Sequence, residues 1–294
     1  MDINETFSPL VQLLDILNLQ DSPTLSNTHQ YTANNLNQPM GRVYGGQVLA
    51  QGLLAAGKTV PQERLPHSLH GYFIRPAKVE IPLFFDVEVL NDGRSFSTRR
   101  THVFQEDQVI LTMVSSFQEP QRGVEHGAHM PSVPRPEELP SAVDILGSIN
   151  VPMAQFWSND SPIEVKHVDP ALYLQADKEL HATQSVWLRT KGQVPENELL
   201  HRALLAFACD QIILEPVLRG HGLSWSKPGL SLASLDHCIW WHRPVRADEW
   251  LLYVQQSPSA TGGRGLGLAY VFSEAGEHVA TVGQEGMIRI PEIV

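Results

Sequence analysis

Two stretches of the chain are largely apolar over a length that suits a helix, and each opens with residues that favour a helix start. The first covers residues 44–60, where Gly45 and Gly46 precede "QVLAQGLLAAG". The second covers residues 196–213, with Pro195 just before it, a residue favoured in the first turn of a helix. The pattern predicts two mostly apolar helices, and the small residues of the first would let it lie close inside a curled sheet.

Each predicted helix is followed by four runs with the alternation or apolar content of β-strands. After the first helix the runs are "HSLHGYFIRP", "IPLFFDVEVLNDG", "SFSTRRTHVFQEDQ" and "VILTMVSSFQE". After the second they are "LASLDHCIWWHRP", "EWLLYVQQSPS", "GLGLAYVFSEAG" and "HVATVGQEGMIR". One more strand is expected before each helix, in "HQYTANNLN" and "HATQSVWLRT".

The two halves also share short motifs. "FIRP" at residues 73–76 recurs as "WHRP" at residues 241–244, and "FQE" at residues 117–119 recurs as "GQEG" around Gln284. A tandem duplication explains both recurrences. The prediction is an α+β protein in which two helix-and-sheet halves follow one another.

A proline-rich region separates the halves and breaks the alternating pattern. It reads as a linker that runs over the surface. We therefore expect a first unit over residues 1–119, a linker over residues 120–162 and a second unit over residues 163–294.

The segment "ALLAFACDQIILEP" places one aspartate, Asp210, in a run that is otherwise almost wholly apolar. Because a buried, ionised carboxylate is costly when it lacks partners, this side chain must have a compensating partner, be held neutral, or face a cavity. Pro216 follows six residues later, which suggests that Asp210 lies too far back to cap the helix. Both a catalytic base and a structural hydrogen-bonding residue fit these constraints.

Charge narrows the classes of partner. The 294 residues include 21 lysines and arginines against 32 aspartates and glutamates, a formal charge of −11, with no basic tract. Nucleic acid and anionic membranes are therefore poor partners, whereas a few local arginines could still hold a small anionic ligand. The hydrophobic share of 42% and the charged share of 18% are those of an ordinary globular protein.

Cysteine usage and the termini bear on the compartment. Cys209 and Cys238 are the only cysteines and lie in apolar surroundings, which indicates a reducing compartment. The N-terminal "MDINETFSPLVQLLDILNL" is unlike a signal peptide, no run reaches transmembrane length, and "RIPEIV" has no peroxisomal tripeptide. The expectation is a cytoplasmic protein that does not associate with membranes.

Several motifs in this order resemble the acyl-coenzyme A thioesterase II family, whose fold is the double hotdog. They are "YGGQVLAQ", "HSLHGYFIRPA", "LNDGRSFSTRR", "MVSSFQEP", "SLDHCIWWHRP", "EWLLY" and "TVGQEGMIR". The resemblance covers nearly the whole chain. It implies one continuous sheet, hydrolysis of acyl-CoA thioesters to free fatty acid and CoA, and a homodimer or homotetramer.

The resemblance also assigns residues. It implies that Asp210, Ser234 and Gln284 carry catalysis, so that most catalytic residues belong to the second unit. A thioester is already electrophilic, so its hydrolysis needs an oriented water, a base and a donor for the developing oxyanion. Asp210 suits the base, and backbone N–H groups of Gly45 and Gly46 at a helix start are candidate donors to the thioester oxygen.

Coenzyme A carries phosphates, so arginines near the recurring motifs are candidates to bind them. Those considered are Arg75, Arg94 and Arg243, together with Arg99, Arg100 and Arg264. The acyl chain is expected between apolar residues of the second helix and the facing strands. No cofactor is expected, and no metal, because the histidines His67, His70, His237 and His242 lack a ligand signature.

One alternative mechanism and two alternative functions are compatible with parts of the sequence. Ser234 could be a nucleophile with His237 as its base, although the chain has no Gly-x-Ser-x-Gly elbow. A hydratase on the same fold would pair an aspartate and a histidine at a helix end, but no histidine follows Asp210 until His221. A non-catalytic acyl-CoA binding module is also compatible with the fold, since fold does not determine function.

Overall fold

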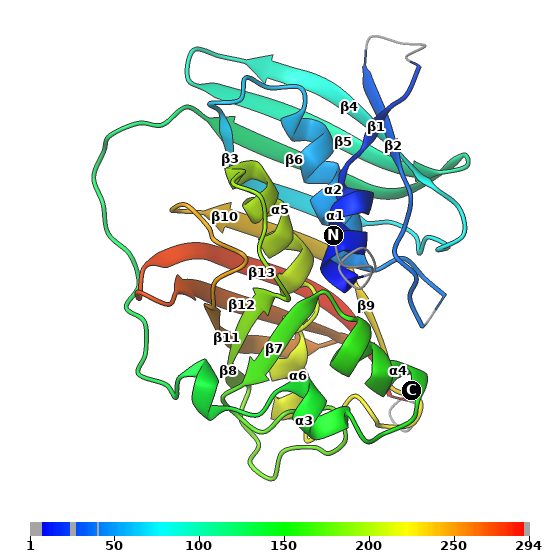
Figure 1. The fold of residues 1–294 in the computed structure, drawn as a ribbon, viewed down its shortest axis with the longest axis vertical. Helices are drawn as coiled ribbons and strands as arrows, with labels where there is room; N and C mark the ends of the chain where they lie inside the picture. Colours follow the sequence, from blue (N-terminus) through cyan, green and yellow to red (C-terminus); the bar gives the residue numbers. More distant parts are fainter. Residues whose placement is uncertain (1–7, 24–27, 40, 291–294) are drawn as a thin grey trace.

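The computed structural model describes residues 8–23, 28–39 and 41–290. Their strands form a 13-stranded antiparallel sheet, with the helices of the two halves packed on one face (Figure 1). The elements of the first half are α1 (Pro9–Leu17), β1 (Gln20–Asp21), β2 (His29–Ala33), α2 (Gly45–Gly57), β3 (Leu65–Phe73), β4 (Leu83–Asp92), β5 (Phe96–Gln105) and β6 (Gln108–Gln118).

From its two leading strands onward the second half repeats the order of the first, with an additional helix, α6, and an additional short strand, β9. It comprises β7 (Ile163–His167), β8 (Thr183–Thr190), α5 (Glu198–Cys209), α6 (Glu215–Gly220), β9 (Ser231–Ser234), β10 (Asp236–Trp241), β11 (Leu251–Thr261), β12 (Arg264–Ser273) and β13 (His278–Arg289). Every strand predicted from the alternating pattern is present, and "LASLDHCIWWHRP" forms two strands, β9 and β10. The predicted α+β double hotdog is confirmed.

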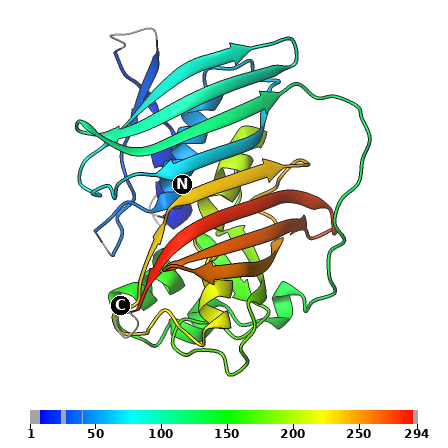
Figure 2. The same cartoon turned by 180° about the vertical axis from the view of Figure 1, so that it is seen from behind.

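The strand order is the same when it is read outward from the centre of the sheet in either direction. It runs β1-β2-β4-β5-β6-β3-β10-β13-β12-β11-β8-β7, with β9 paired to β13. The halves meet where β3 and β10 pair antiparallel, with His70 opposite Cys238. A twofold axis between these two strands would relate the halves. Figure 2, the view from behind, shows the sheet continuing from one half into the other.

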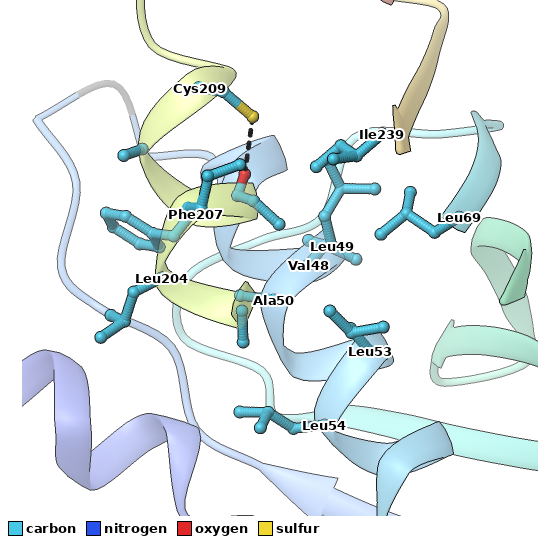
Figure 3. Packing of buried hydrophobic residues seen from close by; sticks show 14 of the residues in the cluster. Val48, Leu49, Ala50, Leu53, Leu54, Leu69, Leu204, Phe207, Cys209 and Ile239 are labelled. Atoms are coloured by element: carbon cyan, nitrogen blue, oxygen red, sulfur yellow. Dashed lines mark hydrogen bonds between the residues drawn. The ribbon is translucent and has the colours of Figure 1, made fainter. Parts of the chain in front are cut away.

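The core lies between the two central helices and the middle strands. On α2 every residue from Gly46 to Ala56 is buried. Figure 3 shows Val48, Leu49 and Leu53 of α2 beside Leu204 and Phe207 of α5, with Leu69 and Ile239 from β3 and β10 closing the cluster. The two helices contact each other directly, and the Tyr44 hydroxyl at the start of α2 donates to the Phe207 carbonyl near the end of α5, so these two helix ends lie close together.

The second central helix is shorter than predicted. It begins after Asn197, whose side chain accepts a hydrogen bond from the Leu200 N–H, so Pro195 precedes the helix. It ends at Cys209 rather than near residue 213, because Pro216 occupies the first turn of the separate helix α6. The proline starts a new helix, and a turn over residues 210–214 lies between the two.

The region predicted as a linker runs along the outside of the molecule (Figure 1). It is not without structure, since it contains a 3₁₀ turn and three short helical segments, η1 (Pro136–Glu138), α3 (Ala142–Leu146), α4 (Pro152–Gln155) and η2 (Phe156–Asp160). The short helices begin at a capping serine or a proline: Ser141 caps α3 and Pro152 opens α4.

Candidate active site

Asp210 lies at the C-terminal end of α5, and both carboxylate oxygens are hydrogen-bonded. It is the C-cap residue of the helix, which corrects the sequence-based prediction. The Ser234 hydroxyl donates to Oδ1 at 2.9 Å, and the Gly46 N–H at the start of α2 donates to Oδ2 at 2.8 Å. The helix-end dipole disfavours a carboxylate here, and these two donors, one from each half, offset that cost.

Glycine is required on the α2 side of this contact. A Cβ at Gly45 would lie 2.7 Å from Asp210 Oδ2, and a Cβ at Gly46 would lie 2.3 Å from the Phe207 carbonyl oxygen. The Tyr44 hydroxyl, donating to the same carbonyl at 2.7 Å, ties the two helix ends together. The Gly-Gly pair therefore permits the close approach, and the Gly46 N–H is already bound to Asp210.

Glycines on the sheet hold the turn after Asp210 close to β12 and β13. A Cβ at Gly267 would lie 2.0 Å from the Ile213 carbonyl oxygen, and one at Gly286 would lie 2.2 Å from a methyl carbon of Leu214. Larger residues at either strand position would push the turn outward. The position of Asp210 therefore depends on small residues far away in the sequence.

Ser234 and Gln284 come from neighbouring strands of the second half. Ser234 ends β9, where it pairs with Gly286 of β13, two residues beyond Gln284. Gln284 is 1% exposed, and its Nε2 donates to Ser234 Oγ at 2.9 Å. The structure therefore brings the three predicted catalytic residues into one chain of hydrogen bonds, Gln284 to Ser234 to Asp210.

His237 extends this chain and was not assigned to it from the sequence. Its Nδ1 bonds Gln284 Oε1, and its Nε2 lies 3.2 Å from Cys209 Sγ. Burial lowers the pKa of the imidazole, against the opposing charge of Asp210. Burial, reinforced by the Asp210 charge, raises the pKa of the Cys209 thiol well above its usual range.

These bonds bear on the idea that Ser234 is a nucleophile. Both ring nitrogens of His237 face other partners, Gln284 and Cys209. Ser234 Oγ is bonded to Asp210 and Gln284 instead. The geometry therefore lacks the serine–histidine contact that a nucleophilic mechanism requires. The sequence signal for His237 is the "LDH" directly after Ser234, but the sequence alone suggests this histidine only as a base for Ser234.

The candidate phosphate-binding arginines lie at different ends of the sheet. Arg75 follows β3 at the end nearest Asp210, and its side chain donates to the Val109 carbonyl at 3.1 Å. Arg94 lies in the turn between β4 and β5, and Arg243 follows β10, both at the opposite end of these strands. Arg243 is also within 3.8 Å of Glu125.

Two further cations flank the start of α2. Arg42 precedes Gly45 by three residues, and Lys78 follows Arg75 by three. The two residues form an isolated antiparallel bridge, so their side chains lie next to each other. Arg42, Arg75 and Lys78 are exposed, and none of the three forms an ion pair within the described ranges. The sequence analysis missed Arg42 and Lys78 because only the backbone bridge brings them together.

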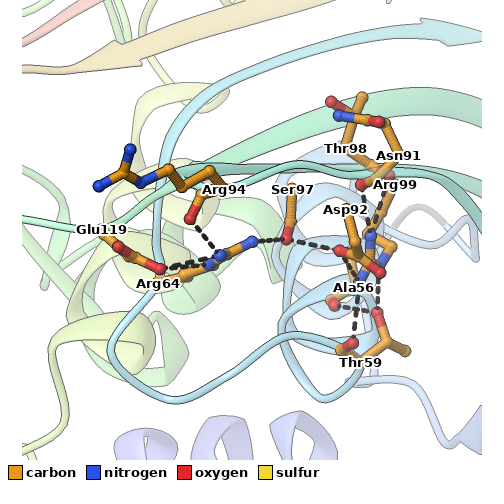
Figure 4. Close-up of polar contacts among 10 residues, drawn as sticks. All are labelled: Ala56, Thr59, Arg64, Asn91, Asp92, Arg94, Ser97, Thr98, Arg99 and Glu119. Carbon is orange, nitrogen blue, oxygen red and sulfur yellow. Dashed lines mark hydrogen bonds and ion pairs between the residues drawn. The ribbon is translucent and has the colours of Figure 1, made fainter.

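The other candidate arginines, and Arg64, make contacts within the fold. Arg99 is 1% exposed and bonds Thr59 and Asp92, while Arg64 links Ser97 to Glu119 (Figure 4). Arg100 pairs with Glu88, and Arg264 with Glu285.

The acyl site stays a prediction, because the cavity beside the second central helix is only of about the size of one water molecule. A cavity of about 10 Å³ lies between α5 and strands β8 and β11, and its apolar lining includes Leu204, Leu205, Ala208 and Leu251. Where the structure describes the chain, no three His, Cys, Asp or Glu side chains gather as metal ligands. Within those same residues no helix has the length and apolarity to cross a membrane.

Two hotdog units in one sheet, with a carboxylate fixed where their helices meet, define a double-hotdog protein. The acyl-CoA thioesterase family matches residues 162–287, and its N-terminal domain matches residues 36–118. Acyl-CoA thioesterase 2 of Haemophilus influenzae is 35% identical over 258 residues, 85% of this chain and 89% of that protein. The chain therefore belongs to the acyl-CoA thioesterase II family, whose reaction is the hydrolysis of acyl-CoA thioesters.

Other relatives agree with this assignment. Human acyl-coenzyme A thioesterase 8 is 34% identical over 264 residues, 86% of this chain and 82% of that protein. An acyl-CoA thioesterase II from Mycobacterium marinum superposes with a TM-score of 0.78 at 36% identity, over 96% of this chain and all of that one. A hot dog fold protein from Alicyclobacillus acidocaldarius, at 19% identity, has a TM-score of 0.76 and supports the fold alone.

Proposed function

We propose that Asp210 activates the water that hydrolyses the acyl-CoA thioester. The observation that carries this is the carboxylate held at the helix junction by Gly46 and Ser234, one donor on each oxygen. Each oxygen has a further lone pair that can accept a water proton. As the water oxygen bonds to the carbonyl carbon, Asp210 takes the proton; when the C–S bond breaks, it returns the proton to the CoA sulfur.

Ser234 and Gln284 position this chemistry, and the start of α2 supplies the oxyanion donor. Gln284 fixes the Ser234 hydroxyl, and the hydroxyl fixes the carboxylate plane and the water beside it. Because the Gly46 N–H already binds Asp210, Gly45 is the better candidate of the pair to donate to the thioester oxygen. No metal takes part in these steps.

The CoA phosphates bind to Arg75, Arg42 and Lys78 in this proposal. Arg42 and Lys78 lie near the start of α2, Arg75 follows β3 at the same end of the sheet, and none of the three has an acidic partner in the described part of an otherwise acidic chain. Phosphate groups favour such local positive charge. The assignment of Arg94 and Arg243 stays a prediction. Arg75 is preferred because it forms no ion pair among the described residues, whereas Arg243 lies within 3.8 Å of Glu125.

We also propose a homodimer or homotetramer and a cytoplasmic location. Tyr72, Val114 and Trp240 are exposed on neighbouring strands, on the sheet face opposite the helices, which supports pairing with a second copy. The two cysteines are unpaired, which supports a reducing compartment. Light scattering at micromolar concentration tests the assembly, where a monomer mass would contradict it, and cell fractionation tests the location.

The mechanism is tested with Asp210→Asn, which keeps the shape and removes the base. We expect kcat to fall by about two to four orders of magnitude, the usual scale for a general base, with KM nearly unchanged. Release of free CoA thiol from acyl-CoA substrates of several chain lengths gives both constants. The activity should persist in the presence of a chelator.

Matched variants separate catalysis from folding. Ser234→Ala and Gln284→Ala should each lower kcat, and combining either with Asp210→Asn should add little, because groups that act as a unit are not additive. The thermal midpoint of each variant provides the control. Near-full activity of Asp210→Asn together with a lower midpoint would make the carboxylate a structural residue and contradict the proposal.

A further inference from the structure

The ring of His237 is enclosed between the end of α5 and strand β13. The residue lies on β10, is 1% exposed, and contacts Gln284 through Nδ1 and Cys209 through Nε2. Cys209 directly precedes Asp210, and Gln284 bonds Ser234. His237 thus contacts the residue that precedes the proposed catalytic carboxylate in the sequence and the residue that bonds Ser234, without a hydrogen bond to the carboxylate itself.

The partners determine where the ring carries its proton. If Gln284 Nε2 donates to Ser234, then Oε1 faces His237, and a carbonyl oxygen only accepts. Nδ1 must therefore be protonated. In the neutral ring Nε2 is then bare, and the Cys209 thiol, 3.2 Å away, can donate to it; the Ala206 carbonyl is a more distant acceptor at 3.4 Å (Figure 3).

The tautomer of His237 sets the direction of every bond in the chain. Protonated at Nδ1, the ring donates to Gln284, Gln284 donates to Ser234, and Ser234 donates to Asp210. With the proton on Nε2 instead, Gln284 would turn its amide to donate to the ring, and its oxygen would face Ser234. The hydroxyl would then donate to Gln284, and Asp210 Oδ1 would lose its hydrogen bond.

We propose that His237 is a positioning residue for thioester hydrolysis, which fixes the Gln284 amide so that Ser234 donates to Asp210. This rests on the proposed roles of those three residues. The Cys209 thiol supports this arrangement by donating a hydrogen bond to Nε2, which favours the ring protonated at Nδ1. Burial holds the imidazole neutral and the thiol protonated, as this arrangement requires.

Two substitutions at the same position test the role of the Nδ1 donor. His237→Leu removes the donor and leaves Gln284 Oε1 buried without a partner; we expect kcat to fall by about 10- to 100-fold, as for other supporting hydrogen bonds. His237→Asn carries an amide nitrogen attached to Cγ, as Nδ1 is, and should restore kcat to within about threefold of the native protein. KM should stay within about twofold for both variants.

The thiol is tested with a matched pair and a control. Cys209→Ser keeps a donor to Nε2 and should retain kcat, whereas Cys209→Ala should lower it by a few-fold. Cys238→Ala is the control, because this thiol donates to the Gly283 carbonyl and not to His237. Thermal midpoints of all variants show whether a loss of kcat reflects unfolding.

A measurement on the unmodified protein avoids the risk that His237→Leu does not fold. Nitrogen-15 spectra of the histidine rings should show one buried neutral ring protonated at Nδ1, absent from His237→Asn. A ring protonated at Nε2, or equal kcat for His237→Leu and the native protein, overturns the inference. If such a result is obtained while Asp210→Asn is inactive in the same assay, only the role of His237 is contradicted. If Asp210→Asn is fully active, the proposed mechanism on which the inference rests is itself contradicted.

Discussion

The burial of His237 makes the stability of the protein sensitive to acid. Burial lowers the pKa of this ring below its ordinary 6.5, and the same holds for His201 and His67. The unfolded chain therefore takes up protons near pH 6.5 that the folded protein does not bind. The stability contributed by neutral burial is fully present above that pH and is lost as the pH falls below it.

We expect the free energy of unfolding to decline between pH 7.5 and 5.5, by up to about 1.4 kcal/mol per pH unit for a ring that stays neutral in the fold. His237→Asn should make this decline shallower, because the ring no longer takes up a proton on unfolding. Urea unfolding at several pH values measures it, with Cys238→Ala as the control on the same strand. An identical slope for His237→Asn and the native protein would show that His237 is not a source of the effect.

The sequence singles out residues whose chemistry is unusual for their surroundings and misses residues that only distant contacts bring together. The improbable carboxylate of Asp210 was visible in an apolar run, and the resemblance supplied Ser234 and Gln284. The role of His237 was not visible, because it depends on the pairing of β10 with β13 and on where α5 ends. Those contacts join positions far apart in the sequence, and no local pattern encodes them.

At the scale of elements, alternation and apolar runs located the strands and both central helices, while the helix ends were misjudged. Pro216 was taken as the stop of α5, but it begins α6, and the turn between them holds Asp210. The turn is held close by glycines of β12 and β13, which only the folded sheet places beneath it. Helix ends depend on such tertiary contacts more than on propensity.

The junction of α2 and α5 gives a prediction about the two helices as units. In Gly46→Ala the new Cβ would lie 2.3 Å from the Phe207 carbonyl, so the helix ends must separate and the Gly46–Asp210 bond lengthen. We expect a loss of about 1–3 kcal/mol in stability together with a lower kcat. Gly52→Ala on the same helix is the control. Its Cβ would meet the end of the flexible Met113 side chain, Sδ at 3.1 Å and Cε at 3.4 Å, and Thr101 Cγ2 at an ordinary 3.8 Å, and alanine favours a helix interior. If both variants behave alike, close approach at the junction is not what positions Asp210.

For the whole molecule, the two central helices meet at two junctions, and they differ in the residue that caps the helix ending there: Asp210 caps α5, whereas Lys58 caps α2. At the other end of the helix pair, Gly57 of α2 faces Leu199 of α5, and a Cβ at Gly57 would lie 2.4 Å from the leucine side chain. The nearby strands carry the Arg64 and Arg99 networks instead (Figure 4). Within the described residues, the end of α5 thus carries the carboxylate on which the proposed mechanism rests, and the other end of the helix pair is closed by an apolar contact.

The net charge of the whole chain makes the cations near this junction testable. A formal charge of −11 repels CoA, so Arg42, Arg75 and Lys78 should account for much of the local attraction. Changing each to alanine should raise KM for acyl-CoA by about three- to tenfold with kcat nearly constant, and rising salt should reduce the difference by screening. With an acyl-pantetheine substrate, which has no phosphates, the variants and the native protein should have equal KM.

Arg94→Ala, at the far end of the strands, is the control. A rise in KM for Arg94→Ala and none for the other three would move the phosphate site to the opposite end of the sheet.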